Sequence, residues 1–484
     1  MVFAIRLILA IGIVAVMCCC NTTVLAQTAS HLEFASSDKR LEDLFHWAQT
    51  TALRYVGKDD DPVGPWYEAA LPGREAFCIR DASHQCIGAE ILGLSRQNLN
   101  MFRHFVGGIA ESRDYCSYWE IDRLNRPAPV DYASDDDFWY PLNANFDIID
   151  ACNRLYHWTG NTEYVSGGAF DRFFRLSLNE FVDKWQLQPD RILGRQPIMN
   201  LKPSTIQYRE TRGLPSYDEQ QNDIAVGGDL LGMIANGFRT YADILKSRGD
   251  TERSQEYRRK AALYLKQIEQ KWWNPAANNH YDFWTTAGKF RSGGTGGNEY
   301  LLWQRAVKDP ERITASLRAI RNTQVEVLSY LPMLYYRYGL NQEAYDLLVK
   351  LYQNPRRDYP EASYAAIEAL FSGMMGIEPM GGQGIIATCS CLLPGTDWAS
   401  AKHVPLMGLQ LSVSHKSNTD TTLQNESDKR FTWRAEFVGN HPILFVNGRS
   451  RNSKHIKNGL GAIYSYVDVA VKPHSEAHVK TGGG

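Results

Sequence analysis

The sequence has no excess of charge of either sign. Its 484 residues include 52 Lys and Arg against 54 Asp and Glu, which gives a formal net charge of −2. Proteins that bind nucleic acid through its phosphates need a surplus of basic residues. The charge balance therefore argues against nucleic acid as a partner.

Long apolar runs are also lacking after the N-terminus. The first run extends from Leu7 to about Met17, follows an arginine and precedes small residues before Gln27. A membrane-spanning helix needs about 20 apolar residues, whereas a short run with these flanks is typical of a secretory signal peptide. We predict a signal peptide over 1–26 and a mature protein without a membrane span, exported to the periplasm or outside the cell. A lipid anchor at Cys18–Cys20 is the alternative, which the residues before them disfavour.

Several signatures of other chemistries are missing. The sequence contains no Gly-x-Ser-x-Gly elbow, and the glycine-dense stretch Gly293–Gly297 lacks the lysine of a P-loop. Neither the histidines nor the cysteines show the spacing of a zinc site. We therefore predict no metal and no cofactor, and expect the remaining cysteines to be structural thiols or disulfides: Cys78, Cys86, Cys116, Cys152, Cys389 and Cys391.

Helix-period apolar patterns are present from about residue 39 to 376. In the first, Leu41, Leu44, Phe45, Ala48 and Ala52 follow the spacing of one helix face. Such patterns predict twelve helices, near 39–56, 80–94, 96–111, 144–159, 169–186, 225–247, 250–272, 298–306, 309–320, 324–339, 341–353 and 361–375.

The connections between these helices alternate in length. Those after the second, fourth, sixth, eighth and tenth helices are short, whereas those after the first, third, fifth and seventh reach about two dozen residues. Long loops in a compact domain are usually functional. This alternation predicts six helical hairpins in a ring, an (α/α)6 barrel over 27–393, with the long loops on one face.

From about Pro394 the apolar pattern changes to period two. The alternation is clear in 409–415, 431–437, 443–446 and 463–469, with turn residues between them. Several short alternating strands predict a small antiparallel β-sandwich over 394–484. We expect this domain to cap the barrel, and carbohydrate binding by it is an alternative.

Three segments carry a resemblance to a known group: 73–85, 135–145 and 272–282. With the twelve helices and the β-module, they resemble the six-hairpin glycosidases, which include glucoamylases, trehalases, α-rhamnosidases and unsaturated uronyl hydrolases. The resemblance covers nearly the whole mature chain and implies glycoside hydrolysis. That reaction usually needs two carboxyl groups that flank the scissile bond.

In the glucoamylase-like members the two carboxyl groups follow the fifth and eleventh helices. Carried over by position, the resemblance implies Glu361 and either Asp218 or Glu219 as the catalytic pair. Glu361 has an alternative role as an acid in the first turn of the last helix. Asp223 is better explained as the N-cap of the sixth helix.

The long loops after the first and third helices offer groups that could bind a sugar. Arg74 and Arg80 suit a uronate carboxylate, which a guanidinium can hold with two hydrogen bonds. An ion pair of Arg80 with Asp81 is the structural alternative. The full set of predicted binding residues is Arg74, Arg80, Asp81, His84, Trp119, Asp137, Trp139, Asn145 and Tyr359.

Two further sets of acids remain open. Asp81 and Asp137 are a rival catalytic pair, because the resemblance to uronyl hydrolases implies acids on such early loops. Glu120 and Glu326 are weaker candidates.

These residues predict a secreted hydrolase that removes sugar residues, such as uronic acid or rhamnose, from the ends of oligo- or polysaccharides. Inversion is expected by analogy with the group. One alternative is a polysaccharide lyase that uses Tyr67, His84, Arg74 and Asn145. The other is a glycan-binding protein without catalysis.

Overall fold

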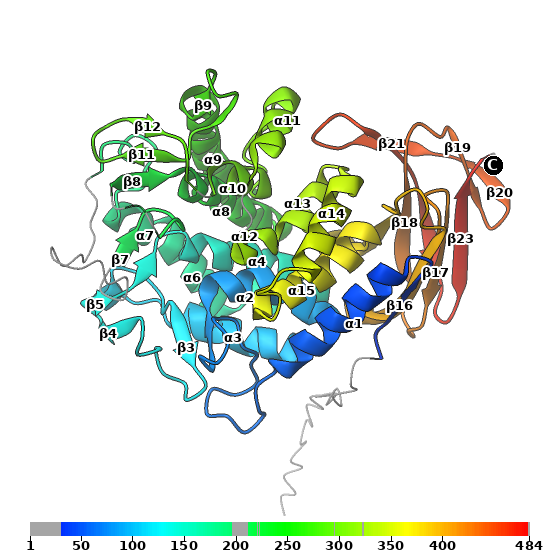
Figure 1. Cartoon of the computed structure of the whole chain (residues 1–484), viewed down its shortest axis with the longest axis horizontal. Helices are drawn as coiled ribbons and strands as arrows, with labels where there is room; N and C mark the ends of the chain where they lie inside the picture. The colour runs from blue at the N-terminus through cyan, green and yellow to red at the C-terminus, as the bar shows by residue number, and fades with distance from the viewer. Residues whose placement is uncertain are drawn as a thin grey trace, which may run out of the picture.

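The computed structural model describes residues 31–195, 212–219, 221, 223–294, 296–321 and 324–482. The predicted signal peptide and the cysteines at 18–20 lie outside these residues. Figure 1 shows a helical part that fills most of the molecule and a β part at its right side. Among the described residues, none of the helices has the length and hydropathy that a membrane crossing requires.

Each of the twelve predicted ranges contains a helix, and the fifth, tenth and twelfth are each split in two. Helix α1 shows why the periodic pattern succeeds: Asp38 caps it by accepting from the Arg40 amide, and its predicted apolar face is buried. The helices are α1 (Lys39–Arg54), α2 (Ile79–Ile91), α3 (Ser95–Gly107), α4 (Ala144–Thr159), α5 (Glu163–Ser166), α6 (Gly168–Leu178), α7 (Glu180–Lys184), α8 (Gly228–Ser247), α9 (Thr251–Lys271), α10 (Gly297–Trp303), α11 (Pro310–Ala319), α12 (Val325–Leu328), α13 (Leu331–Arg337), α14 (Asn341–Tyr352), α15 (Pro360–Glu368) and a π-helical continuation, η3 (Ala369–Met374).

Alternate helices form a closed series of contacts. Helix α2 packs on α4, α4 on α8, α8 on α10, α10 on α13, α13 on α15, and α15 again on α2. In α2 every residue except Arg80 is buried. The approach of α15 to α2 is close enough that a Cβ at Gly88 would lie 2.1 Å from the carbonyl oxygen of Tyr364. We call these six helices the inner helices.

The long connections lead into the inner helices and carry short strands, most of which gather on the left in Figure 1, on the side away from the β part. The following strands pair within and between these connections. They are β2 (Ala76–Cys78), β3 (Glu120–Asp122), β4 (Tyr132–Ser134), β5 (Asp137–Phe138), β6 (Tyr140–Pro141), β7 (Arg212–Leu214), β8 (Ile224–Gly227), β11 (Phe283–Thr285) and β12 (Phe290–Arg291), while β9 (Trp273–Asn274) pairs with β10 (Asn279–His280).

The β part consists of a seven-stranded and a five-stranded sheet. The first has the order β1-β15-β16-β17-β23-β19-β20, and the second β13-β14-β18-β22-β21. Their strands are β1 (Glu33–Ser36), β13 (Glu378–Met380), β14 (Ile385–Cys389), β15 (Trp398–Leu406), β16 (Leu409–Lys416), β17 (Asp420–Asn425), β18 (Phe431–Val438), β19 (Ile443–Val446), β20 (Arg449–Asn452), β21 (Lys454–Lys457), β22 (Ile463–Val471) and β23 (Glu476–Thr481).

The four predicted strands are confirmed as β16, β18, β19 and β22, and two features of these sheets differ from the expectation. Strand β14 pairs in parallel with β18, so the sandwich is not wholly antiparallel. Strands β1, β13 and β14 join the sheets from outside 394–484, because strand pairing depends on spatial neighbours rather than on sequence distance. The domain boundary at 394 stays a prediction. The six described cysteines are free thiols.

Candidate active site

A pocket of about 600 Å³ opens where the long connections meet the N-terminal ends of α2 and α15. It draws on the connections that precede α2, α4, α8 and α15, and on Glu326 in the first turn of α12. Its polar and aromatic lining consists of Arg74, Arg80, Asp81, Trp119, Glu120, Asp131, Trp139, Glu219, Glu326 and Tyr359. We call it the acid–aromatic pocket.

One wall of the acid–aromatic pocket is formed by two tryptophans from the connection before α4. The ring centres of Trp119 and Trp139 lie 4.6 Å apart at 71°, an edge-to-face pair. Edge-to-face packing is a favourable arrangement of aromatic rings, and it holds the wall rigid. Leu71 and Val130, which also line the pocket, are more than 40% exposed. These two side chains beside the tryptophan wall therefore offer apolar surface to a ligand.

Arg80 links two acids across this pocket. Its Nε lies 3.4 Å from Asp81 Oδ1, and another guanidinium nitrogen lies 3.5 Å from Glu219 Oε1. The Tyr359 hydroxyl donates to Asp81 Oδ2 at 2.6 Å. Burial raises the pKa of Glu219, and the charge of Arg80 opposes that rise. Because its side chain keeps 37% of its exposure, Glu219 is also the more hydrated of these two acids.

Glu361 lies directly behind the pocket wall, at the start of α15. It is 0% exposed, and its Oε1 is 2.8 Å from Nδ1 of His84. Its Oε2 has no hydrogen-bond partner. Burial, and next the negative charge of Asp81, raise the pKa of Glu361 well above its ordinary value, against the charge of Arg80. Burial also lowers the pKa of His84. Glu361 therefore tends to hold a proton.

A second group of charges centres on Arg74. Its guanidinium is 2.6 Å from Glu120 Oε2 and 3.6 Å from Asp131 Oδ2. Burial and then the charge of Asp131 raise the pKa of Glu120 to about 8, although Arg74 opposes the shift. Burial also raises the pKa of Asp131. The two acids therefore favour a state in which at least one of them is protonated.

The structure brings most of the predicted binding residues together. Arg74, Arg80, Asp81, Trp119, Trp139 and Tyr359 line the acid–aromatic pocket, as does Glu219 of the predicted catalytic pair. His84 and Glu361 lie behind its wall.

Besides His84 and Glu361, three more predicted residues lie outside the lining. Asn145 is wholly buried, accepting from the Tyr140 hydroxyl at 2.5 Å and donating to Ser177 Oγ at 2.9 Å. Asp218 is buried, and its amide donates to Ser216 Oγ. Asp137 is half-buried in β5. The pocket geometry therefore does not support a direct sugar contact for them.

Three residues of the site were not among the predicted site residues. Asp131 gives no signal beyond its place in a long loop. The Tyr217 hydroxyl donates to Asp147, which lies inside α4 and points inward. Burial raises the pKa of Asp147 to about 6, and His84 opposes that shift. Within the described residues, no group of three or more His, Cys, Asp or Glu side chains could hold a metal ion.

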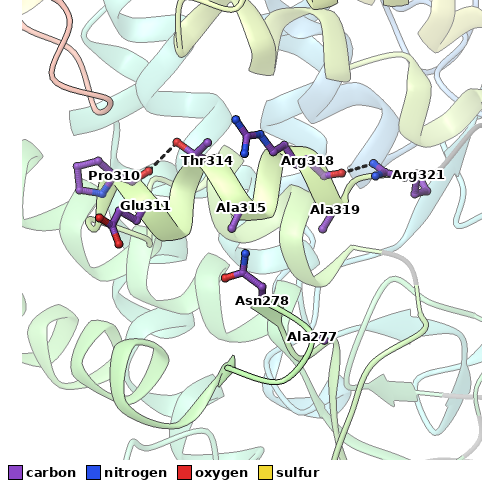
Figure 2. A pocket seen from close by; sticks show the side chains of 9 residues that line it. All are labelled: Ala277, Asn278, Pro310, Glu311, Thr314, Ala315, Arg318, Ala319 and Arg321. Carbon is purple, nitrogen blue, oxygen red and sulfur yellow. Dashed lines mark hydrogen bonds between the residues drawn. The ribbon is translucent and has the colours of Figure 1, made fainter.

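A second hollow, of about 550 Å³, lies between α11 and the turn that joins β9 to β10. Figure 2 shows its lining, in which Thr314 donates to the Pro310 carbonyl oxygen at 2.8 Å. Glu311 is the one carboxylate among the residues drawn, and no aromatic ring is among them. This hollow lacks the acid pair that glycoside chemistry needs.

No family model and no curated protein matches this chain. Several solved structures do match this chain. An α-L-rhamnosidase from Dictyoglumus thermophilum matches with a TM-score of 0.61 at 13% identity, over 93% of this chain and 50% of that one. An α-L-rhamnosidase from Streptomyces avermitilis, complexed with L-rhamnose, matches with a TM-score of 0.55 at 10% identity, over 93% and 42%. A putative kojibiose phosphorylase from the human microbiome matches with a TM-score of 0.54 at 7% identity, over 91% and 63%.

These neighbours are members of the six-hairpin glycosidase superfamily. The chain shares the fold of these solved structures, which agrees with the fold that the resemblance in the sequence implied. It spans half or less of the length of the two rhamnosidases.

Proposed function

We propose that this protein is a glycoside hydrolase that removes a sugar residue from the end of an oligo- or polysaccharide. One observation carries the proposal: a single pocket places a tryptophan wall beside acids of raised pKa. The fold likeness to rhamnosidases supports it. We further propose that the inner helices are the inner ring of an (α/α)6 barrel and that the protein is exported.

The catalytic pair is Glu361 and Glu219, and their surroundings divide the roles between them. Glu361 sits in the drier position and tends to keep its proton, as a general acid must. It is 0% exposed and outside the pocket lining, so this role requires the pocket wall to open when the sugar binds. Glu219 is more hydrated and lies beside Arg80, which favours the ionised form that activates water. Water attack from the face opposite the leaving group would invert the anomeric centre.

The sugar is a neutral 6-deoxyhexose such as rhamnose rather than a uronic acid. Arg74 and Arg80 already face carboxylates of the protein, so a uronate would have to displace an existing partner. The exposed apolar side chains of Leu71 and Val130 suit the methyl group of a deoxy sugar, because burial of a methyl group away from water is favourable.

The test compares Glu361→Gln with Glu219→Gln on two aryl rhamnosides, one with a good and one with a poor leaving group. A general acid matters most for a poor leaving group. We therefore expect Glu361→Gln to lose at least about 100-fold in kcat/KM on the poor leaving group and far less on the good one. Glu219→Gln should lose similar factors on both.

Near-normal turnover by Glu361→Gln on the poor leaving group would reject Glu361 as the acid. Glu120, whose raised pKa also suits an acid, would then be tested by the same substitution. If wild-type protein cleaves aryl glucuronides and leaves rhamnosides intact, the neutral-sugar assignment is wrong.

The residues proposed for the lyase alternative do not gather in the pocket. Of its four residues, Arg74 alone lines the pocket. Tyr67, the candidate base, is wholly buried and donates to Asn98 Oδ1 at 2.7 Å. Lyase products absorb in the ultraviolet through their new double bond, so the absence of such absorbance would separate the two reactions.

A further inference from the structure

A third cavity, of about 620 Å³, lies at the opposite end of the inner helices from the acid–aromatic pocket. The acid–aromatic pocket uses the first residues of α2 and the N-cap of α15. The third cavity uses later positions, such as Arg154 in α4, Arg337 at the end of α13 and Glu368 at the end of α15. We call it the arginine pocket.

Four arginines line the arginine pocket, and three of them lack a carboxylate partner. Arg154 pairs with Glu368 at 2.6 Å. Among the described residues, no carboxylate lies within ion-pair distance of Arg239, Arg305 or Arg337. Arg239 lies in α8, Arg305 follows the end of α10, and Arg337 lies in α13. The fold therefore brings them together from three separate elements.

The arginines are held in place by uncharged groups. Arg337 lies over the Trp303 ring, 3.9 Å from its centre. Arg239 donates to the carbonyl oxygen of Gln304 at 2.7 Å. Burial first, and then the charge of Arg305, lower the pKa of Arg337 to about 10. The same two causes lower the pKa of Arg239. Arg239 and Arg337 remain charged at neutral pH, at a cost that a bound anion would relieve.

Four carboxylates also line this cavity, Asp150, Asp243, Glu368 and Glu378, but none of them lies within ion-pair distance of Arg239, Arg305 or Arg337. Asp150 accepts from the Asn236 amide at 2.7 Å, and Asp243 pairs with Arg258, which is not in the lining. Two further lining residues carry buried polar atoms without a hydrogen-bond partner, Nδ1 of His157 and Oγ of Ser372. Unpaired cations beside unsatisfied polar atoms point to a polar, anionic ligand.

We propose that the arginine pocket binds a small molecule through a phosphate or sulfate group. Guanidinium groups bind tetrahedral oxyanions with paired hydrogen bonds, and three guanidinium groups line this cavity without a carboxylate of the described residues at ion-pair distance. The volume exceeds what a bare oxyanion fills, so an organic phosphate such as a hexose 6-phosphate fits the cavity as well. The proposal does not depend on the reaction at the other pocket.

Calorimetric titration of the full chain tests this, with inorganic phosphate, inorganic sulfate and glucose 6-phosphate as probes and sodium chloride at matched ionic strength as the control. We expect saturable binding of at least one probe. Tighter binding of glucose 6-phosphate indicates an organic ligand, and equal binding indicates the free anion. If no probe binds beyond the chloride control, the proposal is wrong.

Two variants locate the site. Arg337→Gln and Arg305→Asn should each weaken binding at least about tenfold, because each removes a charge-assisted hydrogen bond. Asn suits position 305, where the backbone is left-handed with φ of 50° and the side chain is exposed, so that variant should fold even if Arg337→Gln does not. Arg318→Gln, on the hollow of Figure 2, is the matched control and should bind as wild type does. Wild-type affinity in Arg305→Asn and Arg337→Gln would overturn the location.

Discussion

The acid–aromatic pocket and the arginine pocket lie at the two ends of the same inner helices, yet they treat charge in opposite ways. At the first, arginines and acids pair, and burial raises acid pKa values, to about 8 for Glu120. At the second, three of the four lining arginines have no carboxylate at ion-pair distance within the described part of the chain, and burial lowers the pKa of Arg337 to about 10. Both shifts follow from one cause, since burial disfavours whichever charge is not compensated. This difference in charge pairing underlies both proposals, proton transfer at the first end and anion binding at the second.

The largest expected difference between the two ends is in stability. Arg80→Ala leaves buried Asp81 without its ion-pair partner, and breaking a buried pair in this way costs about 3 kcal/mol. Arg337→Ala removes a cation that has no acid partner, so it should cost about 1 kcal/mol, the value of its contact with Trp303. Urea unfolding of both variants measures the difference. Equal losses would mean that the ends do not differ in charge pairing.

The pH dependence of stability sharpens the same comparison. The folded-state pKa of Glu120, about 8, lies above its ordinary value of 4.5, so the folded protein binds this proton more tightly than the unfolded chain does. Its contribution is complete below pH 4.5 and is lost as the pH rises through 8. We therefore expect the free energy of unfolding to fall between pH 5 and 8, and to fall less in Glu120→Gln.

The matched control for this measurement is Glu163→Gln, because Glu163 forms an exposed pair with Arg103. Its pH profile should follow that of the wild type. An identical slope in Glu120→Gln and wild type would show that Glu120 titrates normally.

The smallest expected effect concerns the tryptophan wall. Trp119→Phe keeps an aromatic ring but loses contact area, at a cost of about 1 kcal/mol in sugar binding, which corresponds to about fivefold in KM. We expect kcat to change little, because the acids are untouched. Trp398→Phe, at an exposed ring of β15, is the control. A larger fall in kcat than rise in KM would place Trp119 in the chemical step.

The helices were predictable because burial imposes a repeating pattern along the chain. Leu41 and Leu44 are on the buried face of α1 as the period of 3.6 requires. The same rule cannot tell whether a polar residue of a fully packed helix faces a pocket or the core. Asn145 shows the difference, since its amide is used inside the core.

The acids of the site show another limit of sequence reasoning. Glu219 and Glu361 were predicted as catalytic acids by carrying loop positions over from the family resemblance. Nothing in the sequence reveals that the side chain of Glu361 is 0% exposed while that of Glu219 keeps 37% exposure. Asp131 meets Arg74 and Glu120 only through folding of the long connection. The arginine pocket was missed for the same reason, because its cations are spread over four separate segments.

Strand β1 has a consequence for how the chain reaches its folded state. Residues 33–36 form the edge of the seven-stranded sheet beside β15, and Ser36 donates to the carbonyl oxygen of Trp398, 362 residues away. During synthesis β1 cannot pair until β15 has been made, and β15 follows all the helices in the chain. Pairing across such a separation closes a very long loop and is slow. A fragment that begins at residue 394 would lack β1 and leave one edge of β15 unpaired. An open strand edge can pair with other chains, so β1 protects the C-terminal sheet from aggregation.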